Sequence, residues 1–404
     1  MGLFDKLFKP GPPSQDEFAK AVLDGIKRAG EKRPVFYDKD RFAIRTPEKN
    51  GALMNLGNAY PELCGAPKSA RPGVVQKWIR MWLATCTEMP DDFEDARPDL
   101  LPTVQARSHY ELVQLQFEVE GRKGAARPYE IVGEHFAVGL VYDLPESMKH
   151  VTHAALDGWG VTLYEALETA RHNLAQLPFA FVGPGEGEGL WACMAKDSYD
   201  SARILLPDVL RGFRVRGDIV AMIPNRETLL VAGADDLGSL KGMLTLAKET
   251  LQQPRRISGI ALRLDGDEWT PWLPEESHPL YWDFRRLHTQ SFGQAYSEQK
   301  ELLDKLHEKT GEDVFVASFL GMEREGTNEL SSYCVWGNGV LAWLPRTDLV
   351  VCAETKGQTP RMVPWERVVE VVGDLMKPMG MYPERWQVSE FPSAEQLKAM
   401  RGNS

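Results

Sequence analysis

The chain has 404 residues, of which 43% are hydrophobic and 26% are charged. This composition is typical of folded globular proteins, and a chain of this length can bury a sizeable core, so global disorder is excluded. Asp and Glu outnumber Lys and Arg by 58 to 47, which gives a net charge of -11. That average charge repels a phosphate backbone, so we expect no nucleic-acid partner unless a basic patch is segregated.

The five cysteines are widely spaced and include no CxxC pair. A disulfide framework or a zinc ribbon needs closely spaced pairs, so we expect free thiols in a reducing compartment. No stretch reaches the ~20 apolar residues of a transmembrane helix, and the N-terminus lacks the apolar run of a secretory signal. The sequence therefore predicts a cytoplasmic protein. The cysteines are Cys64, Cys86, Cys193, Cys334 and Cys352.

The first nine residues place Leu3, Phe4, Leu7 and Phe8 on one face of a short helix. Two interpretations are open. The helix contacts a membrane surface or a partner, or it is a helical turn packed onto the rest of the protein. Proline and glycine follow directly, so residues 1–13 are predicted to be a short amphipathic N-terminus and a linker.

Residues 14–90 are predicted to form an α-β-α unit. Ser14 and Glu17 have the spacing of a capping box, which starts a helix with apolar residues at helical intervals. Short β-rich runs separated by turn residues follow, and then a second helix. The predicted elements are a helix over 15–30, strands near 35–37, 41–45 and 52–56, and a helix near 74–82.

Residues 91–257 are predicted to form an α+β core. Thr162 and Glu165 form a second capping box. Pro224 and Asn225 have the residue types that a tight turn between two strands requires. The predicted elements are apolar runs near 112–119 and 131–142, a helix from 163 to 174, a helix after the N-cap Asp200, a hairpin over 219–231 and a helix over 237–251.

From about residue 258 the alternation of strands and helices begins again, which predicts a C-terminal α+β unit. The predicted elements are a strand near 257–264, a Trp- and Pro-rich stretch, a polar helix ended by Gly311, strands near 314–319 and 332–336, a hairpin over 340–352 and a helix from Pro364. The fold class is therefore α+β, with repeated helix–hairpin or meander–helix units and mainly antiparallel sheets.

The two predicted hairpins can be aligned with a single gap. Residues 219–232 then lie over 340–352, and Pro224 faces Pro345. Two explanations are open. The hairpins share β-propensity and turn chemistry, or the C-terminal unit duplicates the unit at 200–252. A duplication predicts equivalent strand neighbours for both hairpins.

Several different short motifs follow one another along the central part of the chain. They lie at 100–102 with Arg107, 141–145, 156–160, 170–174, 197–200, 205–207 and 223–226. In order and spacing they resemble a bacterial family typified by YtpQ, and the resemblance covers about residues 100–250. No activity is assigned to that family, so the resemblance implies no cofactor and no catalytic residue.

The best candidate metal ligands are His150, His153 and Asp157, whose spacing would place them on one helical face. Thr152 competes with this arrangement, because as an N-cap it would start a helix at His153 and separate the two histidines. No ligand set reaches four at suitable spacing, so we expect no stoichiometric metal and no cofactor.

Two functions are consistent with the sequence. The first is a non-catalytic cytosolic interaction or regulatory protein with a protein partner, and the lack of any catalytic motif favours it. The alternative is a hydrolase-type enzyme with a polar site, in which His172 acts as a general base beside acidic and basic groups. The candidate polar site consists of Arg107, Asp143, His172, Asp200 and Arg226.

The stretch from 269 to 284 is dense in aromatic and proline residues. Proline keeps such a segment out of a central strand, and large rings are costly to leave in water. The rings either fill a seam between two parts of the fold or anchor a protein partner. The candidate partner contacts are Trp269, Trp272, Tyr281 and Trp282.

Overall fold

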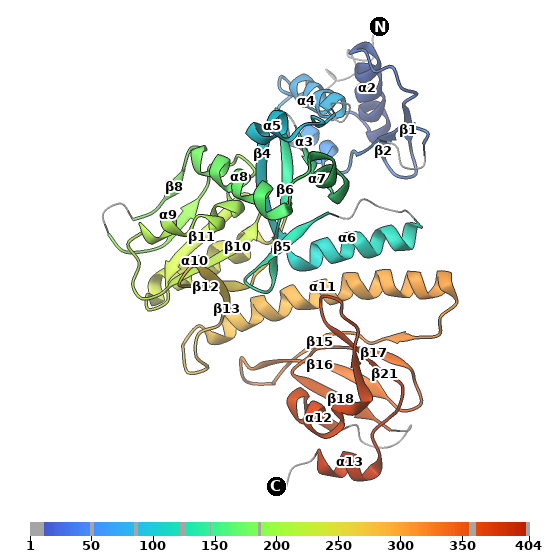
Figure 1. Cartoon of the computed structure of the whole chain (residues 1–404), viewed down its shortest axis with the longest axis vertical. Coiled ribbons are helices and arrows are strands. Elements are labelled where there is room, and N and C mark those ends of the chain that lie inside the picture. Colours follow the sequence, from blue (N-terminus) through green and yellow to red (C-terminus); the bar gives the residue numbers. More distant parts are fainter. Residues whose placement is uncertain are drawn as a thin grey trace. The chain divides into compact units, whose positions relative to one another are not determined.

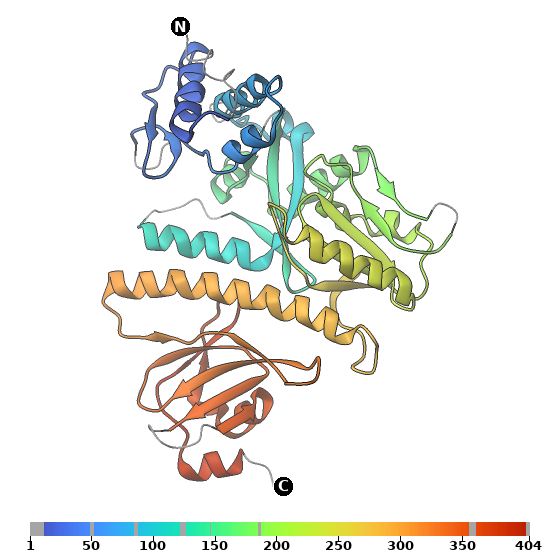
Figure 2. The ribbon, with the colours of Figure 1, turned by 180° about the vertical axis from the view of Figure 1, so that it is seen from behind.

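The computed structural model describes residues 12–48, 52–84, 88–121, 127–145, 147–184, 187–354 and 361–400. It is an α+β fold with mainly antiparallel sheets (Figures 1 and 2), which confirms the predicted fold class. The predicted N-terminal amphipathic face of Leu3, Phe4, Leu7 and Phe8 lies outside the described residues, as does Cys86.

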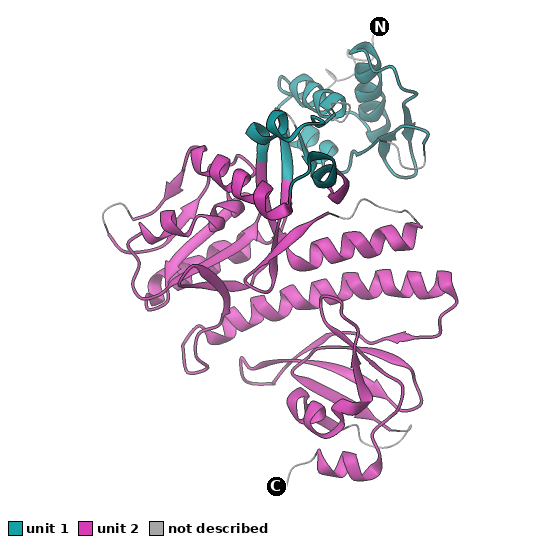
Figure 3. Cartoon of the chain, viewed as in Figure 1, with its two compact units in different colours: residues 1–100, 141–151, 155–161 teal, residues 101–140, 152–154, 162–404 magenta. Residues whose placement is uncertain are grey.

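The chain divides into two compact units (Figure 3). Unit 1 comprises residues 1–100, 141–151 and 155–161, and unit 2 comprises residues 101–140, 152–154 and 162–404. The division falls within strands β4 (Leu100–Ala106) and β6 (Phe136–Leu144).

Unit 1 contains the predicted helix–meander–helix arrangement. The capping box of Ser14 and Glu17 is present, and Phe18, Val22 and Ile26 point into the core, as the helical spacing predicts. Trp82 is buried in the same core. The elements are α2 (Gln15–Arg28), an antiparallel sheet of β1 (Phe36–Asp38), β2 (Ala43–Arg45) and β3 (Leu53–Asn55), and the helices α3 (Ala59–Gly65), α4 (Arg71–Ala84) and α5 (Phe93–Ala96).

A second sheet has the order β4-β6-β5, and β7 also pairs with β6. Three helices follow its strands in the chain, and the second of them begins at His153, as the competing role of Thr152 predicted. The remaining elements of this region are β5 (Tyr129–Val132), β7 (Ser147–His150), α6 (Arg107–Glu120), α7 (His153–Trp159) and α8 (Leu163–Gln176).

The largest sheet has six strands in the order β13-β12-β10-β11-β9-β8. The predicted hairpin at 219–231 is confirmed as β10 paired antiparallel with β11. Helix α10 packs against these two strands in a shared apolar core. The elements are β8 (Phe181–Val182), β9 (Trp191–Cys193), α9 (Pro207–Arg211), β10 (Ile219–Asn225), β11 (Thr228–Gly233), α10 (Leu237–Thr250), β12 (Ala261–Asp265) and β13 (Glu268–Trp272).

Helix α11 (Tyr281–Thr310) is 30 residues long and ends at Gly311, whose φ of 77° suits glycine. It precedes two four-stranded sheets, with the orders β14-β17-β21-β20 and β15-β16-β18-β19. The elements are β14 (Phe315–Val316), β15 (Leu320–Glu323), β16 (Leu330–Gly337), β17 (Ala342–Pro345), β18 (Leu349–Ala353), β19 (Arg361–Pro364), α12 (Trp365–Val372), β20 (Met376–Pro378), β21 (Arg385–Val388) and α13 (Ala394–Ala399).

The predicted hairpin at 340–352 does not form. β17 pairs with β14 and β21, whereas β18 pairs with β16 and β19 in the other sheet. Pro224 lies in β10, which pairs with the next strand, β11. Pro345 lies in β17, which does not pair with β18. The strand neighbours of the two segments differ, so the hairpin match carries no support for an internal repeat.

Candidate functional site

The five residues of the predicted polar site do not line one cavity, although the segments of Asp200 and Arg226 are adjacent, since the amide of Ser201 donates to the Arg226 carbonyl oxygen at 3.2 Å. Asp143 lies in β6 opposite Met148, His172 is exposed on α8, and Arg226 lies in the turn after β10. Arg107 begins α6 and lines a small cavity of about 250 Å³. None of the three cavities described here is lined by more than one of the five residues.

Asp200 has a structural role that the sequence pattern did not reveal. Its carboxylate is fully buried and accepts hydrogen bonds from the amides of Ala195 (2.7 Å) and Lys196 (2.9 Å) and from the Cys193 thiol (3.1 Å). It makes no side-chain N-cap bond to the following helical turn, contrary to the prediction. Burial raises the pKa of Cys193 to about 12, which keeps this thiol protonated.

The predicted metal ligands lie in two different elements. His150 ends β7, and His153 begins α7. Within the part of the chain that the structure describes, no group of three or more His, Cys, Asp or Glu side chains is arranged to hold a metal ion. No described helix has both the length and the apolar character needed to cross a bilayer.

The four aromatic residues predicted as partner contacts all lie in unit 2. Trp269 is buried, and its indole N–H donates to the carbonyl oxygen of Ile204 at 3.0 Å. Trp272 packs edge-on against Phe284, with 5.2 Å between ring centroids. Both tryptophans lie in β13, an edge strand, which is the position that Pro271 permits. The other two residues, in the first turn of α11, are Tyr281 and Trp282.

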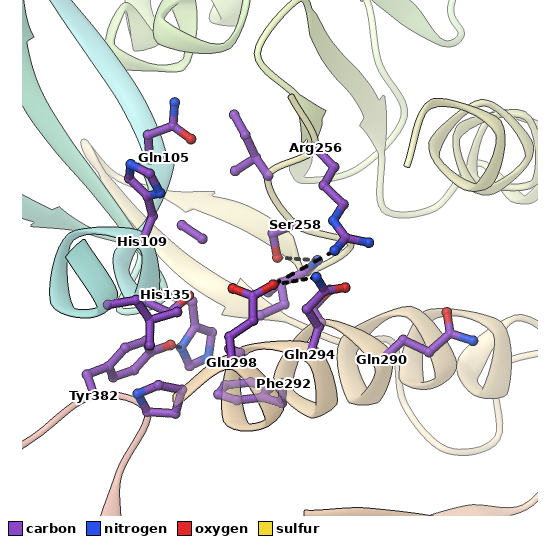
Figure 4. A pocket seen from close by; sticks show the side chains of 18 of the residues that line it. Gln105, His109, His135, Arg256, Ser258, Gln290, Phe292, Gln294, Glu298 and Tyr382 are labelled. Atoms are coloured by element: carbon purple, nitrogen blue, oxygen red, sulfur yellow. Dashed lines mark hydrogen bonds and ion pairs between the residues drawn. The ribbon is translucent and has the colours of Figure 1, made fainter. Parts of the chain in front are cut away.

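The largest of these cavities is a groove of about 550 Å³ in unit 2 (Figure 4). It is lined by α6, α11, the segment that connects α10 to β12, and the residues around Tyr382. Figure 4 shows His109 on the α6 side, Arg256 and Ser258 on the connecting segment, and Gln294 and Glu298 on α11. The α11 residues that line it recur every three or four positions, so they form one helical face.

Glutamine is concentrated in this groove, which is lined by five of the fourteen glutamines in the chain. Gln294 donates its amide N–H to Glu298 at 2.5 Å, and Gln116 donates to Glu120 at 2.7 Å. Each therefore keeps its carboxamide oxygen available as an acceptor. Three other glutamine side chains that line the groove make no hydrogen bond to a described residue; they are Gln105, Gln252 and Gln290.

The charged side chains of the groove are neutralised in pairs. Each lysine or arginine that lines the groove has a carboxylate within ion-pair distance. Such pairing leaves little net field to attract an anion or a cation. The pairs are Lys248 with Asp283 (2.6 Å), Arg256 with Glu298 (3.8 Å) and Lys305 with Glu301 (2.6 Å).

His135 and Tyr382 lie at the lower left of the view in Figure 4. The Nδ1 atom of His135 and the hydroxyl oxygen of Tyr382 are 2.8 Å apart, and the Arg107 guanidinium lies 4.3 Å above the Tyr382 ring. Burial, with a smaller effect of Arg107, lowers the pKa of His135 to about 4. The imidazole is therefore uncharged at neutral pH.

The turn between β5 and β6 positions His135. Gly133 and Glu134 both have positive φ angles, 57° and 63°, and the amide of His135 donates to the Gly133 carbonyl oxygen at 2.6 Å. A Cβ atom on Gly133 would lie 2.6 Å from a Leu262 side-chain carbon, so a larger residue here would strain the backbone and displace Leu262. The His135 carbonyl accepts from the amide of Arg107 at 2.9 Å, which fixes the start of α6 beside this turn.

No motif in the sequence indicates this groove. Its residues come from five separate segments, and glutamine belongs to none of the motifs that indicate catalysis or metal binding. The only local signal is Gln290 and Gln294 at i and i+4 on a polar helix, a spacing that is also typical of a solvated surface.

Comparison of the chain with models of protein families, with curated proteins and with solved structures gives no match. The resemblance to the YtpQ-typified family therefore stays a prediction.

Proposed function

We propose that this protein is a non-catalytic interaction protein and that the groove binds an extended, uncharged peptide segment of a partner protein. The observation that carries the proposal is the set of glutamine amides in one groove. A carboxamide presents a donor and an acceptor side by side, which matches the N–H and C=O groups of an extended peptide backbone.

The paired charges of the groove support an uncharged ligand. A phosphate or a strongly acidic segment needs unneutralised arginine or lysine, and the three cations that line the groove already have carboxylate partners. Apolar side chains such as Leu112, Ile257 and Leu287 line the same groove. They would contact alternate side chains of the bound segment.

We do not propose the hydrolase alternative. Its acidic candidate Asp200 already accepts three hydrogen bonds in the interior. A general base also has to reach its substrate beside the other catalytic groups, and His172 does not line the groove or either of the other two cavities described.

The test is a selection of random, phage-displayed peptides on the full chain, followed by fluorescence anisotropy with the enriched peptides. We expect the double variant Gln105→Ala/Gln290→Ala to weaken binding at least about tenfold. Gln114→Ala is the matched control, since Gln114 is exposed on α6 and does not line the groove. The control variant should bind like the wild type.

Salt dependence gives the second measurement. Binding to an uncharged groove should change little between low and high ionic strength, because there is no net charge to screen. Peptides that bind the double variant as well as the wild type contradict the proposal. Enrichment of only strongly charged peptides, released by salt, contradicts it too.

A further inference from the structure

A second cavity in unit 2, with a volume of about 390 Å³, adjoins the groove at His135, Phe292 and Tyr382. It is lined on one side by α11 and on another by the connection between β17 and β18. Its lining combines aromatic rings with polar and charged side chains. A volume of this size is typical of sites for small molecules rather than for chain segments.

Aromatic rings make up much of the cavity lining. Tyr296 and Phe319 are stacked, with centroids 5.1 Å apart and ring planes inclined by 14°. Phe292, Trp365 and Tyr382 also line the cavity. Rings placed in this way favour a flat ligand, which can stack on one ring and meet the edges of others.

Both arginines that line this cavity are paired with carboxylates of the lining, whereas the exposed Glu134 and Glu384 have no lysine or arginine partner among the described residues. Arg285 donates to both carboxylate oxygens of Asp348, which further accepts from the amide (2.7 Å) and hydroxyl (2.8 Å) of Ser332. Arg346 donates to Glu366 at 2.9 Å. These bonds engage both arginines, so an anionic ligand would have to displace an existing carboxylate. Solvent and salt screen the two exposed carboxylates.

His288 is one of the polar side chains of this cavity that have no partner among the described residues, and the indole N–H of Trp365 is another. Neither ring nitrogen of His288 has a hydrogen bond to a described residue, and Nδ1 is itself buried. The hydroxyl of the neighbouring Thr289 is buried and unpartnered as well. Because Nδ1 has almost no exposed surface, a ligand in the cavity would reach the imidazole through Nε2, which is not among the buried atoms and has no partner among the described residues.

The protonation states favour binding over proton transfer. Burial and the nearby Arg285 lower the pKa of His288 to about 3, and the pKa of His135 is about 4. A general base works best with a pKa near the working pH, and these imidazoles are far weaker bases. As neutral rings, each offers one donor and one acceptor.

We infer that this cavity binds an uncharged, planar heteroaromatic molecule of about the size of a nucleobase, which stacks on the aromatic lining and hydrogen-bonds to His288. The site is independent of the peptide proposed for the groove, and each can be present without the other.

The experiment measures binding of three small probes to the full chain by saturation-transfer NMR and calorimetry. Adenine is planar and uncharged and carries donors and acceptors, whereas benzoate is an anion and benzylamine a cation of similar size. We expect adenine to bind at least about tenfold more tightly than either ionic probe. Equal binding of all three probes, or no adenine binding at millimolar concentration, would overturn the inference.

Variants locate the site. His288→Leu keeps a similar side-chain volume but removes the hydrogen bond to the ligand. It should weaken adenine binding at least about tenfold. Thr289→Val, a smaller change beside it, is a second variant in case the first one fails to fold. His172→Leu is the matched control, because His172 is exposed on α8 and outside the cavity. Wild-type affinity in both His288→Leu and Thr289→Val means that adenine binds elsewhere, which refutes the site.

Discussion

At the residue scale, buried polar side chains show which groups the fold uses for itself. Arg385 is 1% exposed, and its guanidinium donates to the Gln299 side chain (2.7 Å) and to the carbonyl oxygens of Ala317 (2.8 Å), Trp343 (3.1 Å) and Tyr296 (3.3 Å). Burial lowers its pKa to about 10. This cation therefore connects α11 to the sheet of β14, β17 and β21 and is not available to a ligand.

The partly buried imidazoles of His135 and His288 predict a specific pH dependence of stability. In the folded state the pKa values of His135 and His288 lie near 4 and 3, below the ~6.5 of an unfolded histidine. The unfolded state therefore binds more protons between these values. The contribution of the two neutral histidines to the free energy of unfolding is fully present above about pH 6.5 and is lost as the pH falls toward 4.

We expect the wild type to lose about 2 kcal/mol more than His288→Leu when the pH is lowered from 7 to 5. Urea unfolding at the two pH values measures this difference, and His172→Leu is the control at an exposed position. If His288→Leu and the wild type respond equally to pH, then His288 is not held neutral in the folded protein.

At the element scale, close backbone approaches determine where glycine is indispensable. Gly233 ends β11. A Cβ atom there would lie 2.0 Å from the carbonyl oxygen of Arg216 and 2.4 Å from its amide nitrogen. These are backbone atoms, so no side-chain rotation relieves the clash. The strand end and the loop before β10 can pack together only because this residue has no side chain.

Gly233→Ala is therefore expected to lower the free energy of unfolding by about 3 kcal/mol. Gly158→Ala is the comparison, since Gly158 lies in α7 with no atom within 4 Å of the added methyl group. There we expect a gain of up to about 1 kcal/mol, because alanine favours the helix. Urea titration followed by tryptophan fluorescence measures both, and equal effects at the two sites would refute the steric explanation.

At the scale of the whole molecule, the aromatic stretch joins elements that are distant in the sequence. Trp272 extends from an edge strand of the six-stranded sheet onto Phe284 of α11, where both side chains contact the same apolar core. For Trp272, this arrangement agrees with the interpretation that the aromatic stretch fills a seam within the fold. Trp282 contacts Tyr281 within the same helix, with 4.8 Å between ring centroids.

Trp272→Ala should lower the free energy of unfolding by about 2 kcal/mol, less than for a fully buried tryptophan. It should also speed cleavage by a glutamate-specific protease after Glu275 or Glu276, in the connection between β13 and α11, because the substitution removes a contact between the two elements. Trp282→Ala should have a smaller effect in thermal melts and limited proteolysis. Unchanged stability in Trp272→Ala, together with loss of partner binding, would instead identify a partner contact.

The sequence by itself determined the elements that depend on short-range interactions. The capping boxes at Ser14 and Thr162 form as predicted, because a side chain and an amide three residues apart need no other part of the chain. The hairpin at 219–231 forms for a related reason, since its turn brings adjacent strands together. Helix periodicity also identified the core residues of α2 and α4.

Only the tertiary structure decided which strands pair over long distances and which side chains share a cavity. Local patterns at 342–345 and 349–353 are compatible with a hairpin, but the two strands belong to different sheets. β17 pairs with β14 and with the distant β21, whereas β18 pairs with β16 and β19. The groove and the second cavity likewise combine α6, α11, the β5–β6 turn and Tyr382. Residue spacing reports only on neighbours along one element, so contacts between distant segments appear only once the core has brought them together.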